Sequence, residues 1–244
     1  MRIGHISDFH LRHHLSGTSA VETRRSRDMP EKIARAVEKL NAEGVDWVAV
    51  TGDLVDHPFE QMHSPENLER GEADLQLVRS LLAQLTCPVF TLYGNHDHPL
   101  LFRRVFPLLE GGVDVADHRI YCFYDEEGND HVPVRVGESL ERLDEALADP
   151  SPLRQIHLQH YLVYPERNAG YPHTYGTADW LRSSLEASGK VWLLLSGHFH
   201  TGVPAEQQGG IYYAVAPAFC EFPHPLVIYD CDDASIATRY LQID

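Results

Sequence analysis

The sequence predicts an α/β fold, and two observations carry this prediction. Several segments rich in valine, isoleucine and leucine are apolar at consecutive positions, which is typical of strands buried on both faces of an α/β sheet. Four such segments end abruptly on side chains that bind metals, and in open α/β sheets ligands collect beyond the carboxyl ends of the strands. The four junctions are Asp8-Phe9-His10, Gly52-Asp53-Leu54-Val55-Asp56, Gly94-Asn95-His96-Asp97 and Gly197-His198-Phe199-His200.

The N-terminal segment predicts a βαβ unit. Asp28 and Glu31 match a capping box at the start of its helix, and Ile33, Val37 and Leu40 form one apolar helical face. We expect the two flanking strands to be parallel, with a right-handed crossover. In order, the pattern predicts a strand over 2–7, a polar loop over 11–27 that borders the site, a helix that ends at Gly44 and a strand over 45–51.

The rest of the chain continues the alternation of strands and helices, and no linker divides it, so we predict one domain over residues 1–244. Around Gly128-Asn129, two flanking strands predict a hairpin. In order, we expect a loop over 57–71, a helix over 72–85, a strand over 88–93, a helix over 100–109, strands over 118–124 and 131–136, a helix over 139–148, a strand over 153–159, a polar aromatic loop over 161–176, a helix over 178–187, and strands over 191–196, 211–215, 226–230 and 236–241.

Composition narrows the class of protein. The formal net charge of -16 repels polynucleotide phosphates, which argues against a nucleic-acid partner and favours a small substrate. No apolar run approaches the ~20 residues that a membrane span needs, and the strand that begins at Arg2 leaves no room for a secretory signal. The four cysteines show no C-x-x-C spacing, so we expect free thiols and a cytoplasmic location.

The polar groups at the strand ends form a constellation with the chemistry of a metal site. Imidazole together with carboxylate and an amide oxygen suits Mn, Fe or Zn. The ligands are too many for one metal, whereas two divalent metal ions about 3.5–4 Å apart with a bridging carboxylate would use them all. Asp53 follows the central strand and is the natural bridge. The constellation contains Asp8, His10, Asp53, Asp56, Asn95, His96, Asp97, His160, His198 and His200.

In this order, the motifs resemble those of the calcineurin-like metallophosphoesterases. The resemblance spans residues 8 to 200 and implies a four-layer αββα sandwich of two mixed β-sheets flanked by helices, with a binuclear centre at the strand ends. Between His157 and His160, spacing leaves the lone histidine ligand open, and the strand-end position favours His160. By resemblance, one metal would be held by Asp8, His10, Asp53 and His200, and the other by Asp53, Asn95, His160 and His198.

The resemblance also implies a mechanism. A hydroxide held between the two metals attacks phosphorus, and His96 protonates the leaving oxygen as a general acid. Asp56 would orient the ring of His96. The alternative for Asp56 is a turn-capping role with no part in the chemistry.

For the substrate, the sequence is most similar to small bacterial cyclic-nucleotide phosphodiesterases, in the stretches 6–11 and 216–220. This similarity favours a small phosphodiester. A phosphomonoesterase, a nuclease and a non-catalytic scaffold of the same fold are the alternatives. Protein phosphatases of the superfamily have an arginine after the second aspartate, where this chain has His57. Asn95, Tyr161 and His173 are the expected substrate contacts, although the aromatic residues of the second loop could instead pack over the sheet.

Overall fold

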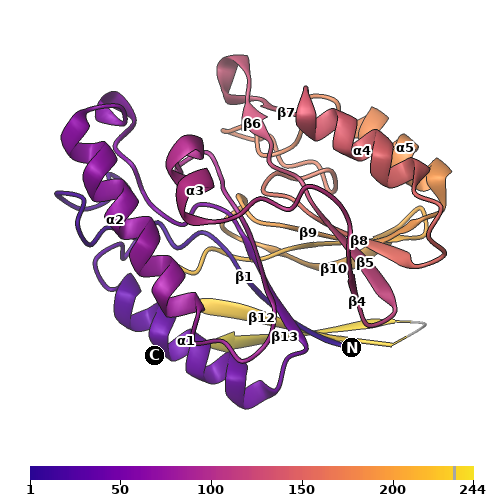
Figure 1. Cartoon of the computed structure of the whole chain (residues 1–244), viewed down its shortest axis with the longest axis horizontal. Coiled ribbons are helices and arrows are strands. Elements are labelled where there is room, and N and C mark those ends of the chain that lie inside the picture. Colours follow the sequence, from indigo (N-terminus) through magenta and orange to yellow (C-terminus); the bar gives the residue numbers. More distant parts are fainter. Residues whose placement is uncertain (233–234) are drawn as a thin grey trace.

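The structure is a computed structural model, and it describes residues 1–232 and 235–244. Two large mixed β-sheets lie face to face, and helices cover the outer side of each (Figure 1). This arrangement confirms the expected αββα sandwich. The five-stranded sheet has the order β13 (Ile236–Gln242), β12 (Pro225–Cys231), β1 (Arg2–Ile6), β2 (Trp47–Thr51), β3 (Val89–Leu92). The six-stranded sheet has the order β10 (Val203–Gln208), β11 (Ile211–Val215), β9 (Val191–Ser196), β8 (Arg154–Leu158), β5 (His118–Cys122), β4 (Val113–Val115).

The helices divide between the two outer layers, as Figure 1 shows. The first two cover the five-stranded sheet, the third packs against the second, and the last two cover the six-stranded sheet. In the described residues, no helix is both long enough and apolar enough to cross a membrane. The helices are α1 (Met29–Glu43), α2 (Pro65–Leu82), α3 (Pro99–Val105), α4 (Glu138–Ala148) and α5 (Ala178–Ser188).

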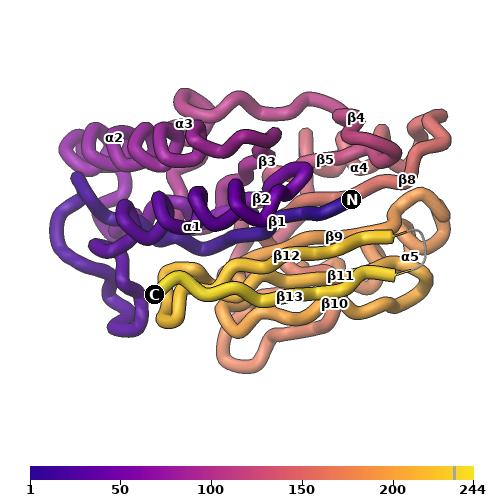
Figure 2. The backbone as a smooth tube through the Cα atoms, turned by 90° about the horizontal axis from the view of Figure 1, so that it is seen from below, coloured from indigo at the N-terminus to yellow at the C-terminus, as the bar shows by residue number. Residues whose placement is uncertain are grey.

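Consecutive apolar residues make the central strands buried on both faces. Every residue of β2 and β9 is buried, as expected for strands that lie between a helix layer and a second sheet. The strands β1, β2 and β3 are parallel to one another, and so are β5, β8 and β9. At the far edge, β13 lies beside β10 of the other sheet (Figure 2). The carboxyl ends of the central strands therefore deliver their loops to a common end of the sandwich.

The segment expected to be a loop over 57–71 is partly helical, so this prediction is wrong. Helix α2 begins at Pro65 rather than at residue 72. Ser64 caps it by accepting a hydrogen bond from the backbone N–H of Asn67, and proline is tolerated in a first helical turn. The first two turns of α2 are polar, which favoured the prediction of a loop. The pair Ser64-Pro65 is the sequence signal that marks the start of this helix.

Two further expectations fail for local reasons. Asp28 makes no capping hydrogen bond to α1, because its carboxylate instead pairs with Arg25. The hairpin around Gly128-Asn129 does form, but it joins the short strands β6 (Glu126–Glu127) and β7 (Pro133–Val134), while β5 pairs with β4 and β8. Strand β10 was not anticipated, since its outer half is polar and exposed. The other predicted helices and strands are present with slightly shifted ends.

Candidate active site

Hydrogen bonds of backbone N–H groups tie the four junctions together at the strand ends. The third junction is joined by the N–H of His96, which donates to Oδ1 of Asp53 at 2.8 Å. The N–H of Asp8 donates to the carbonyl of Gly52 at 3.0 Å, and the N–H of His10 donates to the carbonyl of Asp53 at 2.9 Å. Across the two sheets, the N–H of His198 donates to Oδ2 of Asp8 at 3.1 Å. Segments far apart in sequence are thereby fixed within the reach of one another's side chains.

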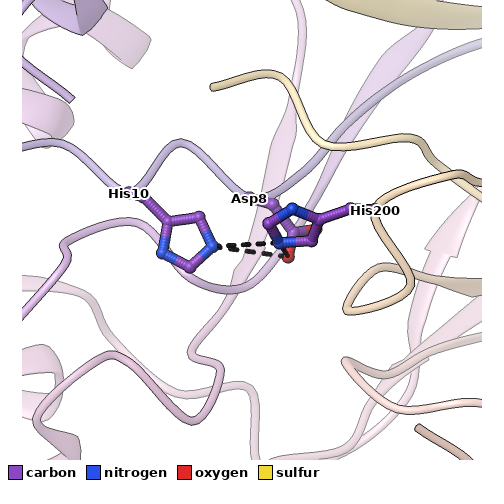
Figure 3. Close-up of side chains that lie close together, drawn as sticks. All are labelled: Asp8, His10 and His200. Atoms are coloured by element: carbon purple, nitrogen blue, oxygen red, sulfur yellow. Dashed lines mark hydrogen bonds and ion pairs between the residues drawn. The ribbon is translucent and has the colours of Figure 1, made fainter. Parts of the chain in front are cut away.

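A first group of ligand atoms comes from Asp8, His10 and His200, which converge in Figure 3. Nε2 of His10 lies 3.3 Å from Nε2 of His200 and 3.8 Å from Oδ1 of Asp8. Nε2 of His200 lies 3.6 Å from the same oxygen. Oδ1 of Asp8 is buried and has no hydrogen-bond partner. An unpartnered carboxylate oxygen among imidazole nitrogens is the donor set that a divalent cation takes.

A second group comes from Asp53, His160 and His198, with Asn95 beside it. Nε2 of His160 lies 3.5 Å from Oδ2 of Asp53 and 3.2 Å from Oδ1 of Asn95. Nε2 of His198 is buried without a partner. Oδ2 of Asp53 also lies 3.4 Å from Nε2 of His10, so one oxygen faces both groups. Residues that could hold two metals are thus present, and Asp53 stands between them.

The other ring nitrogens of two ligand candidates are held by fixed acceptors, as metal-binding histidines require. Nδ1 of His160 donates to the carbonyl of Thr51 at 2.6 Å. Nδ1 of His200 donates to Oε1 of Glu221 at 2.8 Å, and the hydroxyl of Thr23 donates to the same carboxylate. Glu221 did not emerge from the sequence, where it follows an apolar stretch and belongs to no metal-binding pattern.

The pKa shifts of four buried side chains favour a cation-binding site; these are Asp8, Asp53, His160 and His198. Burial raises the pKa of Asp8. Burial opposes the ionisation of Asp53 as well, but the neighbouring imidazoles hold its pKa well below the usual range. Burial alone would lower the pKa of His160, yet the charge of Asp53 raises it to about 9, whereas burial keeps the pKa of His198 well below 6.5. The carboxylates thus draw positive charge inward, and a metal there would displace the proton from His160.

The comparisons with known proteins decide the family. The sequence model described as calcineurin-like phosphoesterase matches residues 1–202. The chain belongs to this family. It is therefore a hydrolase that acts on phosphoric ester bonds, in a family of dimetal enzymes. A comparison with curated protein sequences finds no match.

Solved structures agree on the fold of this phosphoesterase. A dimetal phosphatase from Danio rerio superposes with a TM-score of 0.73 at 18% identity, covering 99% of this chain and 98% of that one. The protein TT1561 of Thermus thermophilus gives 0.63 at 14% identity, with 100% and 99% covered. GAP50, the anchor in the inner membrane complex of Plasmodium, gives 0.62 at 10% identity, with 99% and 84% covered. At these identities the likeness shows the fold alone.

Next to the ligand groups of the phosphoesterase, His96 and Asp56 form a contact pair. Nδ1 of His96 lies 2.9 Å from Oδ1 of Asp56, and Nε2 of His96 lies 3.3 Å from Nη1 of Arg24. Asp56 also accepts from Nε of Arg12 at 2.9 Å. Burial opposes ionisation of Asp56, but the neighbouring imidazoles of His10 and His96 hold its pKa far below the usual range. A permanent carboxylate of this kind can fix the orientation of an imidazole.

Asp97, the last residue of its motif, supports the turn. Its Oδ2 accepts from the N–H groups of Leu54 and Gly94, and its Oδ1 accepts from that of Val55. Burial, followed by the charge of Asp53, raises its pKa to about 7. Asp97 therefore positions the chain around Asp53 and offers no atom to the two ligand groups.

A cavity of about 960 Å³ opens over both ligand groups. The two polar loops border it, as the sequence predicted. Loop 11–27 contributes Arg12, Arg24 and a short stretch around Val21, and loop 161–176 contributes Tyr171 and His173. The remaining walls contain Asp53, Asp56, Asn95, His96, His198, His200, His131 and residues 57–61.

Tyr161 and His157 do not line the cavity. Tyr161 is fully buried and its ring packs against the rings of His160 and His198, so we withdraw it as a substrate contact. His157 is also buried, and its Nε2 donates to Gln155. It packs against Phe123 on the far face of β8, which leaves His160 as the histidine that belongs to the second ligand group.

Proposed function

We propose that this chain is a binuclear-metal-dependent phosphodiesterase whose substrate is a small phosphodiester such as a cyclic nucleotide. The supporting observation is the cavity that opens over both ligand groups. A diester carries two organic arms on one phosphorus, and the cavity is large enough to take both. Besides the polar groups near the ligand candidates, its lining contains apolar and aromatic side chains, among them Val21, Phe59, Tyr171 and His173. Such side chains suit apolar or aromatic arms of a substrate.

The residues would divide the work between metal binding and proton transfer. Asp8, His10, Asp53 and His200 would hold one cation, and Asp53, Asn95, His160 and His198 would hold the other. Bound there, two divalent metals would supply Lewis-acid stabilisation of the phosphoryl charge and a water of lowered pKa. The mixture of imidazole and carboxylate favours Mn, Fe or Zn.

His96 lines the cavity and would give the departing oxygen its proton from Nε2, the ring nitrogen that is not in contact with Asp56. Asp56, 2.9 Å from Nδ1, would hold the ring in that orientation. Asn95 and His173 both line the cavity and would contact the substrate. In this scheme the chain orients the substrate and donates a proton. The residues that do so come from the ends of β2 and β3 and from the two loops.

Two alternatives belong to other classes. Phosphomonoester hydrolysis would fit the description of the Danio rerio relative as a phosphatase. A non-catalytic scaffold would fit the description of GAP50 as an anchor, but the unpartnered ligand atoms and the His96–Asp56 pair favour catalysis. The net charge of -16 argues against a polynucleotide substrate. A cytoplasmic location remains a prediction from the sequence.

One experiment separates these functions. The purified protein is analysed for bound metals and loaded with Mn, Fe or Zn, and turnover is measured with bis(p-nitrophenyl) phosphate, p-nitrophenyl phosphate, cyclic nucleotides and a glycerophosphodiester. We expect two metals per chain and a kcat/KM higher for diesters than for the monoester. A preference for the monoester would contradict the proposal, and two bound metals without any turnover would favour the scaffold.

A further inference from the structure

The cavity holds two guanidinium groups, Arg12 and Arg24, and these are the only arginines or lysines among its lining residues in the described part of the chain. Because the protein is strongly acidic overall, attraction for an anionic substrate must come from local positive groups. Arg103 and Arg104, which follow the third motif on α3, do not line the cavity and pair with Glu138 and Glu72 respectively.

The guanidinium of Arg12 already makes hydrogen bonds within the protein. Its side chain is only 10% exposed, its Nε donates to Oδ2 of Asp56 at 2.9 Å, and its Nη1 donates to the carbonyl of Ser16. A guanidinium held against a carboxylate has its charge largely neutralised. Arg12 therefore holds Asp56 and the loop, with its Nε and Nη1 paired to acceptors of the protein.

Arg24 differs because its hydrogen-bonding capacity is largely unused. Its Nη1 makes two long contacts, 3.4 Å to Oδ1 of Asp56 and 3.3 Å to Nε2 of His96. Its Nε is buried without a partner, and the side chain is 13% exposed. An arginine has five N–H donors and pays a desolvation cost for each one left unpaired. Such a group is suited to a bidentate anion, and phosphoryl oxygens match its fork.

The backbone of Arg24 is fixed relative to the metal-ligand candidates. Its N–H donates to the carbonyl of Val21, and Arg24 forms an isolated antiparallel bridge with Glu221. The carboxylate of Glu221 holds His200, and the N–H of the next residue, Arg25, donates to the carbonyl of Cys220. The backbone of Arg24 is therefore held beside the residue that supports His200, and its guanidinium contacts His96.

We propose that Arg24 is a substrate-binding residue that donates hydrogen bonds to the phosphoryl oxygens of the substrate from the His96 side of the cavity. The inference rests on the proposed function for its substrate class. Arg24 comes from the loop before α1. On binding, the phosphoryl group replaces the two long contacts of Nη1 with charge-assisted hydrogen bonds.

The test compares Arg24→Ala and Arg24→Lys with Arg25→Ala. Arg25 is the matched control, because it lies in the same loop and its loss changes the net charge equally. Its side chain is 61% exposed and pairs with Asp28, away from the cavity. Binding of inorganic phosphate to each metal-loaded protein is measured by calorimetry, kcat and KM are measured with bis(p-nitrophenyl) phosphate, and metal content and thermal unfolding are measured in parallel.

We expect Arg24→Ala to weaken phosphate binding and to lower kcat/KM by roughly 10- to 100-fold, the range of one or two charged hydrogen bonds. Arg24→Lys should recover part of each loss, Arg25→Ala should stay within about twofold of wild type, and metal content should be unchanged. Phosphate binding by Arg24→Ala within about twofold of wild type would overturn the inference, and so would a wild-type protein that does not bind phosphate. A loss of metals or of folding in Arg24→Ala would also overturn it, because it would assign Arg24 a structural role. Phosphate binding that depends on Arg24 without any turnover would refute the phosphodiesterase function and leave the role of Arg24 standing.

Discussion

Gly52 offers a test of how tightly the backbone positions the second ligand group. It has a φ of +102°, and a Cβ added there would lie 2.4 Å from Nδ1 of His160 and 2.9 Å from the backbone nitrogen of Gly94. Both the conformation and the space therefore exclude a side chain. We expect Gly52→Ala to destabilise the fold and to displace His160 from its hydrogen bond with Thr51.

The expected loss in the free energy of unfolding has two parts. The positive φ costs an alanine about 1–2 kcal/mol, and forcing a methyl group into a packed site costs about 1–3 kcal/mol more. The free energy of unfolding should therefore fall by about 2–5 kcal/mol. A ligand side chain displaced by more than about 0.5 Å no longer suits a metal, so metal affinity should also fall about 10- to 100-fold.

Substitutions of two other glycines separate the cost of the positive φ from the cost of the close contact. Gly44 has a φ of +64° with nothing within 4 Å of the added Cβ, and Gly111 has neither a positive φ nor a neighbour. In urea unfolding, Gly44→Ala should lose about 1–2 kcal/mol, Gly111→Ala should lose nothing measurable, and Gly52→Ala should lose the most. Metal titration should show a loss for Gly52→Ala alone. If Gly52→Ala were no worse than Gly44→Ala in both assays, the close approach of Gly52 to His160 would have no energetic consequence.

Three further predictions address the metals, the proton donor and pH. Asp53→Asn should remove most bound metal and abolish hydrolysis while the chain still folds, because Asp53 faces both ligand groups; full metal content by elemental analysis would remove it as the bridge. His96→Ala should cost an alkyl phosphodiester roughly 10²–10⁴-fold in kcat and a nitrophenyl ester clearly less, since phenolate leaves without a proton; equal losses would exclude the general-acid role. Burial lowers the pKa of His5 and of His157 from 6.5 to about 3. Below pH 6.5 these histidines therefore take up protons in the unfolded chain but not in the folded protein. Each should lower the free energy of unfolding by about 2 kcal/mol at pH 5. Urea midpoints that do not fall between pH 7 and pH 5 would contradict this last prediction.

The ligand candidates could be found from the sequence because each one follows its strand directly. Asp8, Asp53, Asn95 and His198 are local signals, since a buried strand that stops on a polar group can be recognised within a few residues. Parallel strands then bring these ends together without further information. The expectation for His160 depended on the same rule, because position at the strand end separated it from His157.

The rest of the site depends on contacts that no local pattern records. Glu221 and Arg24 lie in segments without strand or helix, and their roles come from a single backbone bridge that joins these segments. Tyr161 failed as a substrate contact for the opposite reason. An aromatic residue in a polar loop suggests exposure, but the loop turns back and buries this ring against His160 and His198.

The backbone at the ligand positions shows how the fold prepares the site. Asp8, His10, Asp53 and His198 all have positive φ, between 43° and 65°, a conformation that costs non-glycine residues about 1–2 kcal/mol each. Such strain persists only where the surroundings over-determine it. Here the hydrogen bonds of Asp8 and His10 to the β2 end do so. Because burial also raises the pKa of Asp8, the site combines backbone strain with a carboxylate short of positive charge. A cation between the two ligand groups would relieve the electrostatic part of this cost, at the end of the sandwich where the loops of the central strands meet.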